Sequence, residues 1–290
     1  MVFFCINESI YRYANFIQKE EIIMINSIKP FELLEFTDDY IFYRVMQNDE
    51  ICKELLEHLL KVKIDHIVRQ DVQKELKPFY ESKGIRLDAY IKDSNRIFNI
   101  EMQQVSDDEL PKRSRYYSSM IDTDSLLKGK DYTELAESFI VFICSKDPFK
   151  KGLPVYTFEN MCLEDKNLLL KDMSHKIFFN ASAYQNEKDV EIKSFLDYII
   201  TRKPEDNLTN KINTLVQEIK SRETDRRQYM IEHLKIRDKI MEGKRLGIQE
   251  KAEESAINLL KLQIATPEQV TQVTGLPLEK VQELAKEIKQ

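Results

Sequence analysis

The sequence has few residues that build zinc sites or disulfide frameworks. Among its 290 residues there are four cysteines and four histidines, with no C-x-x-C pair and no histidines at metal-ligand spacing. We therefore expect no zinc chemistry, and interpret the cysteines as buried thiols in a reducing cytosol and the histidines as surface imidazoles. These residues are Cys5, Cys52, Cys144 and Cys162, and His58, His66, His175 and His233.

A long hydrophobic run is also missing. Nothing approaches the roughly 20 apolar residues of a membrane span, and the terminal apolar run 2–6 has neither a basic leader nor a small-residue cleavage site. We therefore expect a cytoplasmic protein without a membrane partner. Residues 1–29 precede every pattern described below, and Met24 is a candidate for the true start.

The chain lacks an excess of positive charge. Its formal net charge is −6, with 42% hydrophobic and 32% charged residues, which is typical of a globular protein of one or two domains. This balance argues against a general nucleic-acid coat, because neutralising phosphates needs a basic surface. It still permits a nuclease whose acidic metal site lowers the net charge while a separate patch holds DNA.

Two alternating runs form the most informative stretch, residues 84–104. Apolar and polar residues alternate over 84–91 and again over 98–103, and turn-forming residues at 93–95 separate the runs. The pattern predicts a hairpin whose strands are each buried on one face, with Glu101 and Gln103 projecting to the same side.

A loop symmetric about Ser94 and Asn95 places Asp88 directly opposite Glu101. Two like charges in that position destabilise a sheet. A divalent cation reverses the sign, because Mg²⁺ binds carboxylate oxygens and can activate water beside a phosphate. Two alternatives stay open: an ordinary hairpin with a solvated carboxylate face, and an asymmetric loop that breaks the opposition.

The residues around this pair resemble a known family. Asp on one strand followed by E-x-K or E-x-Q on the next is the core of the PD-(D/E)xK nuclease superfamily. The surrounding segments, in order and spacing over roughly residues 30–250, resemble the recombination-promoting nuclease and transposase family of bacteria. The segments are TDDYIFYRVM at 37–46, GIRLDAYI at 84–91, FNIEMQ at 98–103, RSRYYSSMID at 113–122, LLKGKDYTEL at 126–135, FIVFIC at 139–144 and DPFKKGLPVYTFEN at 147–160.

The resemblance implies an α/β fold, a restriction-endonuclease-like mixed sheet flanked by helices, and Mg²⁺-dependent cleavage of double-stranded DNA, with Mn²⁺ able to substitute. Asp88 and Glu101 would hold the metal and, with Gln103, would be the catalytic residues. Gln103 takes the place of the usual Lys; it carries no charge and can only orient a water or phosphate by hydrogen bonding. Arg86, opposite Gln103 in the same register, is either the missing cation or a solvated strand arginine.

A further acidic candidate lies on the first helix. Thr37 or Asp38 can cap a helix from Asp39 to Met46, and a second helix is expected over about 50–61. Asp39 matches the acid with which such folds often complete the metal site. The alternative is a first-turn carboxylate favoured by the helix dipole.

A helix opened by Asp107 and Asp108 carries Arg113, Arg115 and Tyr117 close together. Such residues can grip phosphate and stack on bases, so they are candidate DNA contacts. The pattern fits equally a solvated helix whose tyrosine packs on the sheet.

The remaining elements of this domain are predicted from apolar runs. Strands are expected over 67–76, 139–144, 155–158 and 176–179, and a helix over 187–200. The strand over 139–144 should be central, because it is continuously apolar.

The C-terminal part is predicted to be helical. A long helix over 208–240 contains no Gly or Pro, and residues 220–245 hold nine Lys or Arg against five Asp or Glu. This basic helix is interpreted as a solvated or dimerising surface, or as a DNA contact. Gly243 and Gly247 then indicate a hinge.

Two short helices, over 267–273 and 278–288, follow and resemble a helix-turn-helix module. Because Glu279, Glu283 and Glu287 recur along one face of the second helix and would repel phosphate, we favour a protein-protein or dimer-capping role. A homodimer through the C-terminal helical region is expected.

The predicted domains are an N-terminal extension (1–29), a nuclease-like domain (30–205), a long basic helical arm (206–249) and the small module (250–290). The favoured function is a Mg²⁺-dependent DNA endonuclease that promotes recombination. The alternative is a non-catalytic DNA-binding or regulatory protein that retains the fold, and a third class is an oligomeric interaction protein. No DDE constellation is recognisable, so the residues do not indicate transposition itself.

Overall fold

The structure is a computed structural model that describes residues 29–69, 75–76, 85–86, 88–104, 108–126 and 128–288, with the backbone alone at 69, 75–76 and 85–86. Two compact units divide the chain: Pro30–Asp225, and a second that contains Arg226–Gln290. Apart from Lys29, the predicted extension 1–29 lies outside the described residues.

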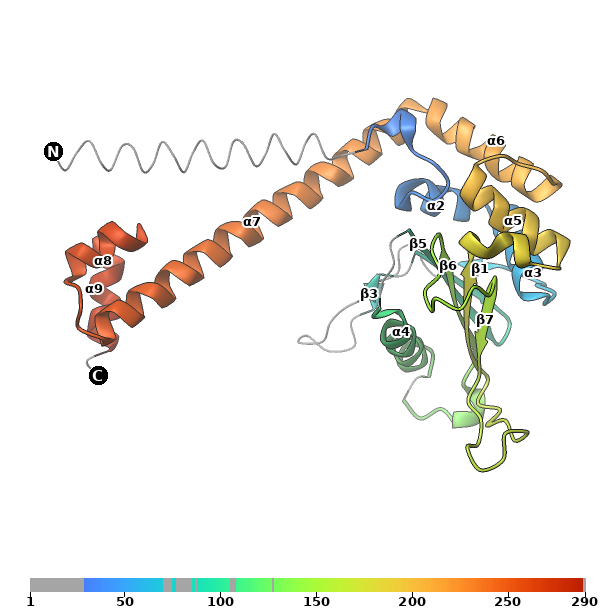
Figure 1. Ribbon diagram of the computed structural model, residues 1–290, viewed down its shortest axis with the longest axis horizontal. Coiled ribbons are helices and arrows are strands. Elements are labelled where there is room, and N and C mark those ends of the chain that lie inside the picture. The colour runs from blue at the N-terminus through green and yellow to red at the C-terminus, as the bar shows by residue number, and fades with distance from the viewer. Residues whose placement is uncertain are drawn as a thin grey trace. The chain divides into compact units, whose positions relative to one another are not determined.

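A mixed sheet forms the centre of the first unit (Figure 1). In the described part its strand order is β1-β4-β5-β6-β8-β7. Strands β5, β6 and β8 run parallel, while β4 and β7 pair antiparallel at either side of them. The bounds are β1 Val68–Arg69, β4 Ala89–Asp93, β5 Arg96–Gln103, β6 Glu137–Cys144, β7 Val155–Phe158 and β8 Ser174–Asn180.

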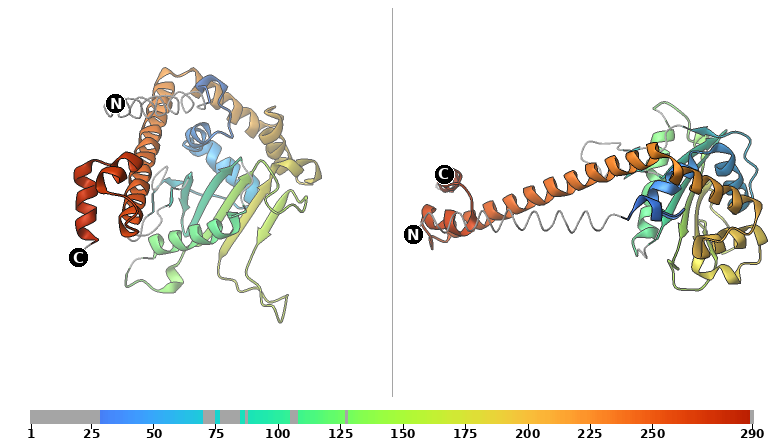
Figure 2. Two further views of the ribbon diagram at one scale, coloured as in Figure 1. Left: turned by 60° about the vertical axis from the view of Figure 1, so that its left-hand side comes forward. Right: turned by 90° about the horizontal axis from the view of Figure 1, so that it is seen from above.

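Helices cover both faces of this sheet. Helix α4 lies along one face, and α3 and α5 lie on the other side (Figures 1 and 2). The restriction-endonuclease-like α/β architecture predicted from the sequence is therefore confirmed. The helices of this unit are α2 Asp39–Met46, α3 Asp49–Leu60, α4 Leu110–Ser125, α5 Val190–Thr201 and α6 Asn207–Ser221, with short 3-10 helices η1 Phe31–Leu33, η2 Tyr132–Glu134 and η3 Ala181–Asn186.

Local chemistry explains where these helices begin. Asp38 occupies the position before α2, as predicted, but its side chain forms no capping hydrogen bond. Asn48 caps α3 by accepting a hydrogen bond from the Ile51 amide at 3.0 Å, and Asp189 caps α5 through two backbone amides. The predicted positions of the first two helices are thus confirmed within a residue or two.

The apolar layer beneath α4 is aromatic. Tyr117 of α4 stacks on Phe142 of β6 at 6.2 Å between ring centroids, and Phe142 stacks on Phe178 of β8 at 5.3 Å. Leu110 and Ile121 of α4 complete this layer. Because rings and aliphatic chains fill the space between helix and sheet, a polar group on this face is shielded from water.

The hairpin has the predicted register. Its ladder runs from Ala89 opposite Ile100 to Asp93 opposite Arg96, so Ser94 and Asn95 form a two-residue turn. The prediction of strands buried on one face only is wrong. β4 and β5 are buried on both faces, because helices cover the sheet on both sides.

The expected strand over 84–91 is also interrupted. Ile85–Arg86 (β3) pairs with Glu75–Leu76 (β2) in a separate two-stranded sheet, and β4 begins only at Ala89. Likewise, the expected strand over 67–76 is two short strands, β1 and β2. The alternating run 84–91 therefore contributes strands to two sheets, where the pattern had predicted one.

The prediction of one continuous helix over 208–240 is wrong. This part of the chain forms two helices, α6 and α7 (Glu223–Lys261), which are separated at Arg222 because its backbone is extended. α6 contacts α2 and α3 because four of its apolar residues are buried, whereas much of α7 is exposed. The predicted domain boundaries stay predictions; the compact unit that holds the sheet reaches Asp225. The buried residues of α6 are Leu208, Ile212, Val216 and Ile219.

In the second unit the predicted hinge is also wrong, because α7 continues through Gly243 and Gly247. A helical glycine costs about 1 kcal/mol relative to alanine, which the surrounding helix formers offset. The two short helices predicted at the C-terminus are confirmed as α8 (Pro267–Thr274) and α9 (Leu278–Glu287). They bury Val270 and Val281 against the end of α7.

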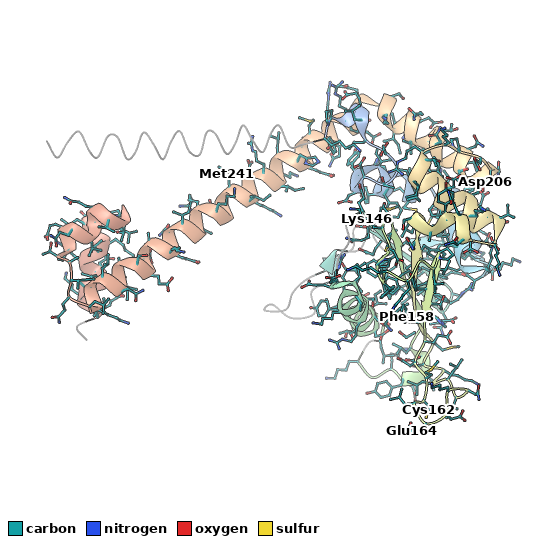
Figure 3. The ribbon with its side chains drawn as sticks, in the orientation of Figure 1. Lys146, Phe158, Cys162, Glu164, Asp206 and Met241 are labelled. Carbon is teal, nitrogen blue, oxygen red and sulfur yellow. The ribbon has the colours of Figure 1, made fainter. Side chains whose placement is uncertain are left out.

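None of the helices in the described ranges combines the length and apolar character of a membrane span. Cys52 and Cys144 are buried, as expected, but Cys162 is only half-buried, because it lies in the connection between β7 and β8 together with Glu164 (Figure 3). Cys5 lies outside the described residues.

The burial of α6 predicts a stability difference. Ile212 in α6 is fully buried, whereas Leu246 in α7 is 45% exposed. We expect Ile212→Ala to lower the free energy of unfolding by about 2–5 kcal/mol, through lost apolar contact and a cavity, and the matched Leu246→Ala by less than about 0.5 kcal/mol. Urea denaturation followed by circular dichroism measures both; equal effects would contradict the packing of α6.

Candidate active site

The candidate site lies where β5 and β6 end. Alternate residues of β5 share one face of the sheet, so Asn99, Glu101 and Gln103 all lie on the face that α4 covers. Strand β6 runs parallel beside it, and the Ser145 amide just beyond β6 donates to the Gln103 carbonyl at 2.9 Å. The carboxyl ends of two parallel strands thus meet at one edge, which is where α/β sheets place their sites.

Asp88 and Glu101 meet in this site. The Asp88 amide donates to Glu101 Oε1 at 3.2 Å, and the Met102 amide donates to Asp88 Oδ2 at 3.3 Å. These two bonds hold Asp88, the residue just before the start of β4, beside Glu101 and Met102 of β5. Glu101 is only 4% exposed and Asp88 is half-buried, so a solvated face is contradicted for Glu101.

Burial raises the pKa of Glu101 well above its ordinary value, and the nearby Asp88 carboxylate raises it further. The Asp88 amide, the Asn99 side chain and Arg113 act in the opposite direction without cancelling these effects. The negative form of Glu101 is therefore disfavoured in the protein alone. A cation placed between the carboxylates would supply the missing countercharge.

The donor set fits a hard divalent cation. Mg²⁺ takes oxygen ligands and is commonly bound by one or two carboxylates with waters. Asp88 and Glu101, which are joined by the hydrogen bond from the Asp88 amide to Glu101 Oε1, supply two carboxylates. The adjacent Asn99 Oδ1 is buried without a hydrogen-bond partner among the described residues. Asp88 and Glu101 could hold the metal.

The structure does not bring Asp39 to this pair. Within the described ranges no three His, Cys, Asp or Glu side chains are grouped so that they could hold a metal ion. Asp39 is exposed in the first turn of α2, while its neighbour Asp38 lies toward the end of β5.

Arg113 supplies the cation of the site. Its guanidinium donates to Gln103 Oε1 and to the Tyr117 hydroxyl, both at 3.2 Å, and lies 3.8 Å from Glu101 Oε2. It also lies over the rings of Tyr117 and Phe142, 5.6 Å from each centroid. This contact to Gln103 was not predicted, although the i, i+4 spacing of Arg113 and Tyr117 indicates that they share a helix face.

Of the other predicted DNA contacts, Tyr117 lies beside Arg113 and Arg115 does not. Arg115 is exposed and lies two residues from Arg113, hence on a different side of α4. The backbone of Arg86 pairs with Glu75 in the β2–β3 ladder, and its side chain lies outside the described residues. Tyr117 is buried, and burial followed by the charge of Glu101 raises the pKa of its hydroxyl, so it stays neutral.

Sequence reasoning missed two residues at this edge. Gln104 follows β5 and donates through Nε2 to the Thr37 carbonyl, which ties the start of α2 to the end of β5. Lys146 is exposed two residues beyond the end of β6 (Figure 3). Neither has a local sequence signal, because each depends on where a strand ends.

Comparison with known proteins matches half of the chain to a family. The sequence model of one family, described as PD-(D/E)XK nuclease family transposase, matches residues 36–180, half of the chain. This match contains the central hairpin, α4 and β6 through β8. No curated protein and no solved structure matches the chain.

The raised pKa of Glu101 predicts a pH-dependent loss of stability. Folded protein keeps this proton to a higher pH than the unfolded chain does, so stability falls as pH rises from the ordinary carboxyl pKa of 4.5 through the raised value. Glu101→Gln removes the titration and keeps an acceptor. At about pH 7 the metal-free variant should be the more stable, by about 1.4 kcal/mol for each unit of upward shift.

Urea denaturation of the metal-free wild type and E101Q between about pH 4 and pH 8 measures this difference. Near the acid end the two proteins should have similar stabilities. A difference that does not grow with pH would show that Glu101 titrates normally.

Proposed function

This chain belongs to the PD-(D/E)XK nuclease family of transposases, and from that premise we propose that it is a Mg²⁺-dependent DNA endonuclease that promotes recombination. The observation that carries the proposal is the buried contact between Asp88 and Glu101 at the end of the parallel strands. A protein that needed only the fold would gain stability from an apolar residue at position 101, because a buried carboxylate beside another is costly.

Asp88 and Glu101 would hold the cation. When bound, Mg²⁺ would supply a water of lowered pKa and neutralise charge on the phosphate. Gln103 would position the water or the phosphate by hydrogen bonding, which requires its amide to be oriented. Arg113 fixes that orientation by donating to Gln103 Oε1 at 3.2 Å.

The positive charge that Lys usually provides would come from Arg113. Its guanidinium is held over two aromatic rings and by Tyr117, so little conformational freedom is lost when a phosphate arrives. A preorganised cation near developing charge lowers the barrier more than a mobile one. Arg86 and Arg115 stay candidate DNA contacts.

A homodimer formed through the C-terminal helical region is part of the proposal. Helix α7 exposes Leu234, Ile240 and Ile248 among basic residues, which is typical of a helix that packs against another. In α9 the glutamates would repel DNA, so this region is better suited to protein contact.

Asp88→Ala tests the chemistry. We expect purified wild type to nick or linearise supercoiled plasmid with Mg²⁺ and not with EDTA, and the variant to lose cleavage by at least about 100-fold while it keeps the wild-type circular dichroism spectrum. Asp165→Ala, at an exposed position in the connection between β7 and β8, is the matched control and should cleave at close to the wild-type rate. Intact plasmid in every lane, from folded protein, would contradict the proposal.

The second candidate is a non-catalytic DNA-binding protein that retains the fold. Gln103 in place of Lys favours it, as does the lack of a third acidic ligand among the described residues. Binding of DNA without cleavage and without any effect of Mg²⁺ would support this candidate.

Lys146 is expected to contact the DNA backbone at the edge of the site. Lys146→Ala should weaken binding of duplex DNA and reduce the slope of log affinity against log salt by about 1. Lys171→Ala, at an exposed position in the connection that leads to the start of β8, is the matched control and should bind like wild type. Fluorescence anisotropy at several salt concentrations measures both; equal slopes for all three proteins would place the DNA elsewhere.

A further inference from the structure

Asn99 is a polar residue in an apolar layer of the sheet. It lies in the middle of β5, is completely buried, and shares the α4 face with Ile97 and Glu101. Its neighbour in β6 is Ile140, and both isoleucines belong to the aromatic and aliphatic cluster under α4. The surroundings of Asn99 would therefore accept an apolar side chain.

The hydrogen bonding of Asn99 is directed at one residue. Nδ2 donates to Glu101 Oε1 at 3.1 Å, and Oδ1 has no hydrogen-bond partner among the described residues. A half-satisfied buried amide is less stable than an apolar residue of similar volume. Packing alone does not account for an asparagine here.

Two donors hold Glu101 from the same side. Oε1 accepts from the Asp88 amide at 3.2 Å and from Asn99 at 3.1 Å, while Oε2 lies toward Arg113 at 3.8 Å. The two bonds together fix the carboxylate plane. With one bond alone, the carboxylate could rotate about its terminal torsion, which is soft.

We infer that Asn99 is a positioning residue, which holds the Glu101 carboxylate in the orientation that binds the divalent cation. This inference rests on the proposed function and adds a residue to it. Groups that orient a metal ligand from behind commonly change metal affinity or activity by about 10–100-fold when removed. Asn99 would do so without touching DNA.

The test uses Asn99→Leu and Asn99→Val, which both remove the donor and suit a buried strand. Three quantities are measured on the full chain: the thermal midpoint without metal, Mn²⁺ affinity by calorimetry, and plasmid cleavage against Mg²⁺ concentration. We expect midpoints equal to or above wild type, Mn²⁺ binding about 10–100-fold weaker, and a rise in the Mg²⁺ concentration for half-maximal cleavage. Ile97→Leu, on the same face of β5, is the control and should change neither metal measurement.

Lower midpoints in both variants would show that Asn99 supports the fold and would overturn the inference. Wild-type Mn²⁺ affinity and cleavage in both variants would also overturn it, and would leave the proposed function intact. A wild type that neither binds Mn²⁺ nor cleaves plasmid would overturn both.

Discussion

The contact between Asp88 and Glu101 is the constraint on which the site depends. Two carboxylates that meet beneath a helix, one of them 4% exposed, repel each other and lose hydration. The rest of the sheet supports this arrangement. A two-residue turn fixes the register, and the aromatic layer under α4 excludes water. A cation would convert the cost into binding energy, which is why we associate this contact with function.

Arg113 and Asn99 contact different oxygens of the Glu101 carboxylate. Arg113, partly exposed on α4, lies beside Oε2 of Glu101 and orients Gln103. Asn99, fully buried in β5, donates to Oε1. In the proposed site Gln103 takes the position that is Lys in most PD-(D/E)xK sites, and Arg113 of the neighbouring helix lies beside it. The neutral amide and the helical cation would then share the function of that lysine.

Much of the fold could be predicted because its signals are local. Alternation and the turn at Ser94 and Asn95 predicted the hairpin register, and the apolar run 139–144 predicted the central strand. The errors arose where distant segments decide: α6 was assigned to a long arm although it packs on α2 and α3, and strand 84–91 divides between two sheets. Arg113 lies beside Glu101 because α4 packs along the sheet, and Lys146 lies at this edge because β6 ends there; no spacing in the sequence reveals either position.

The most direct measurement is anomalous diffraction from crystals of the wild-type protein soaked in Mn²⁺. The account predicts one strong peak bonded to oxygens of both Asp88 and Glu101, at about 2.0–2.3 Å, with Gln103 and Arg113 still hydrogen-bonded beside it. A well-occupied Mn²⁺ site elsewhere on the chain, with the two carboxylates still bonded only to backbone amides and Asn99, would contradict it.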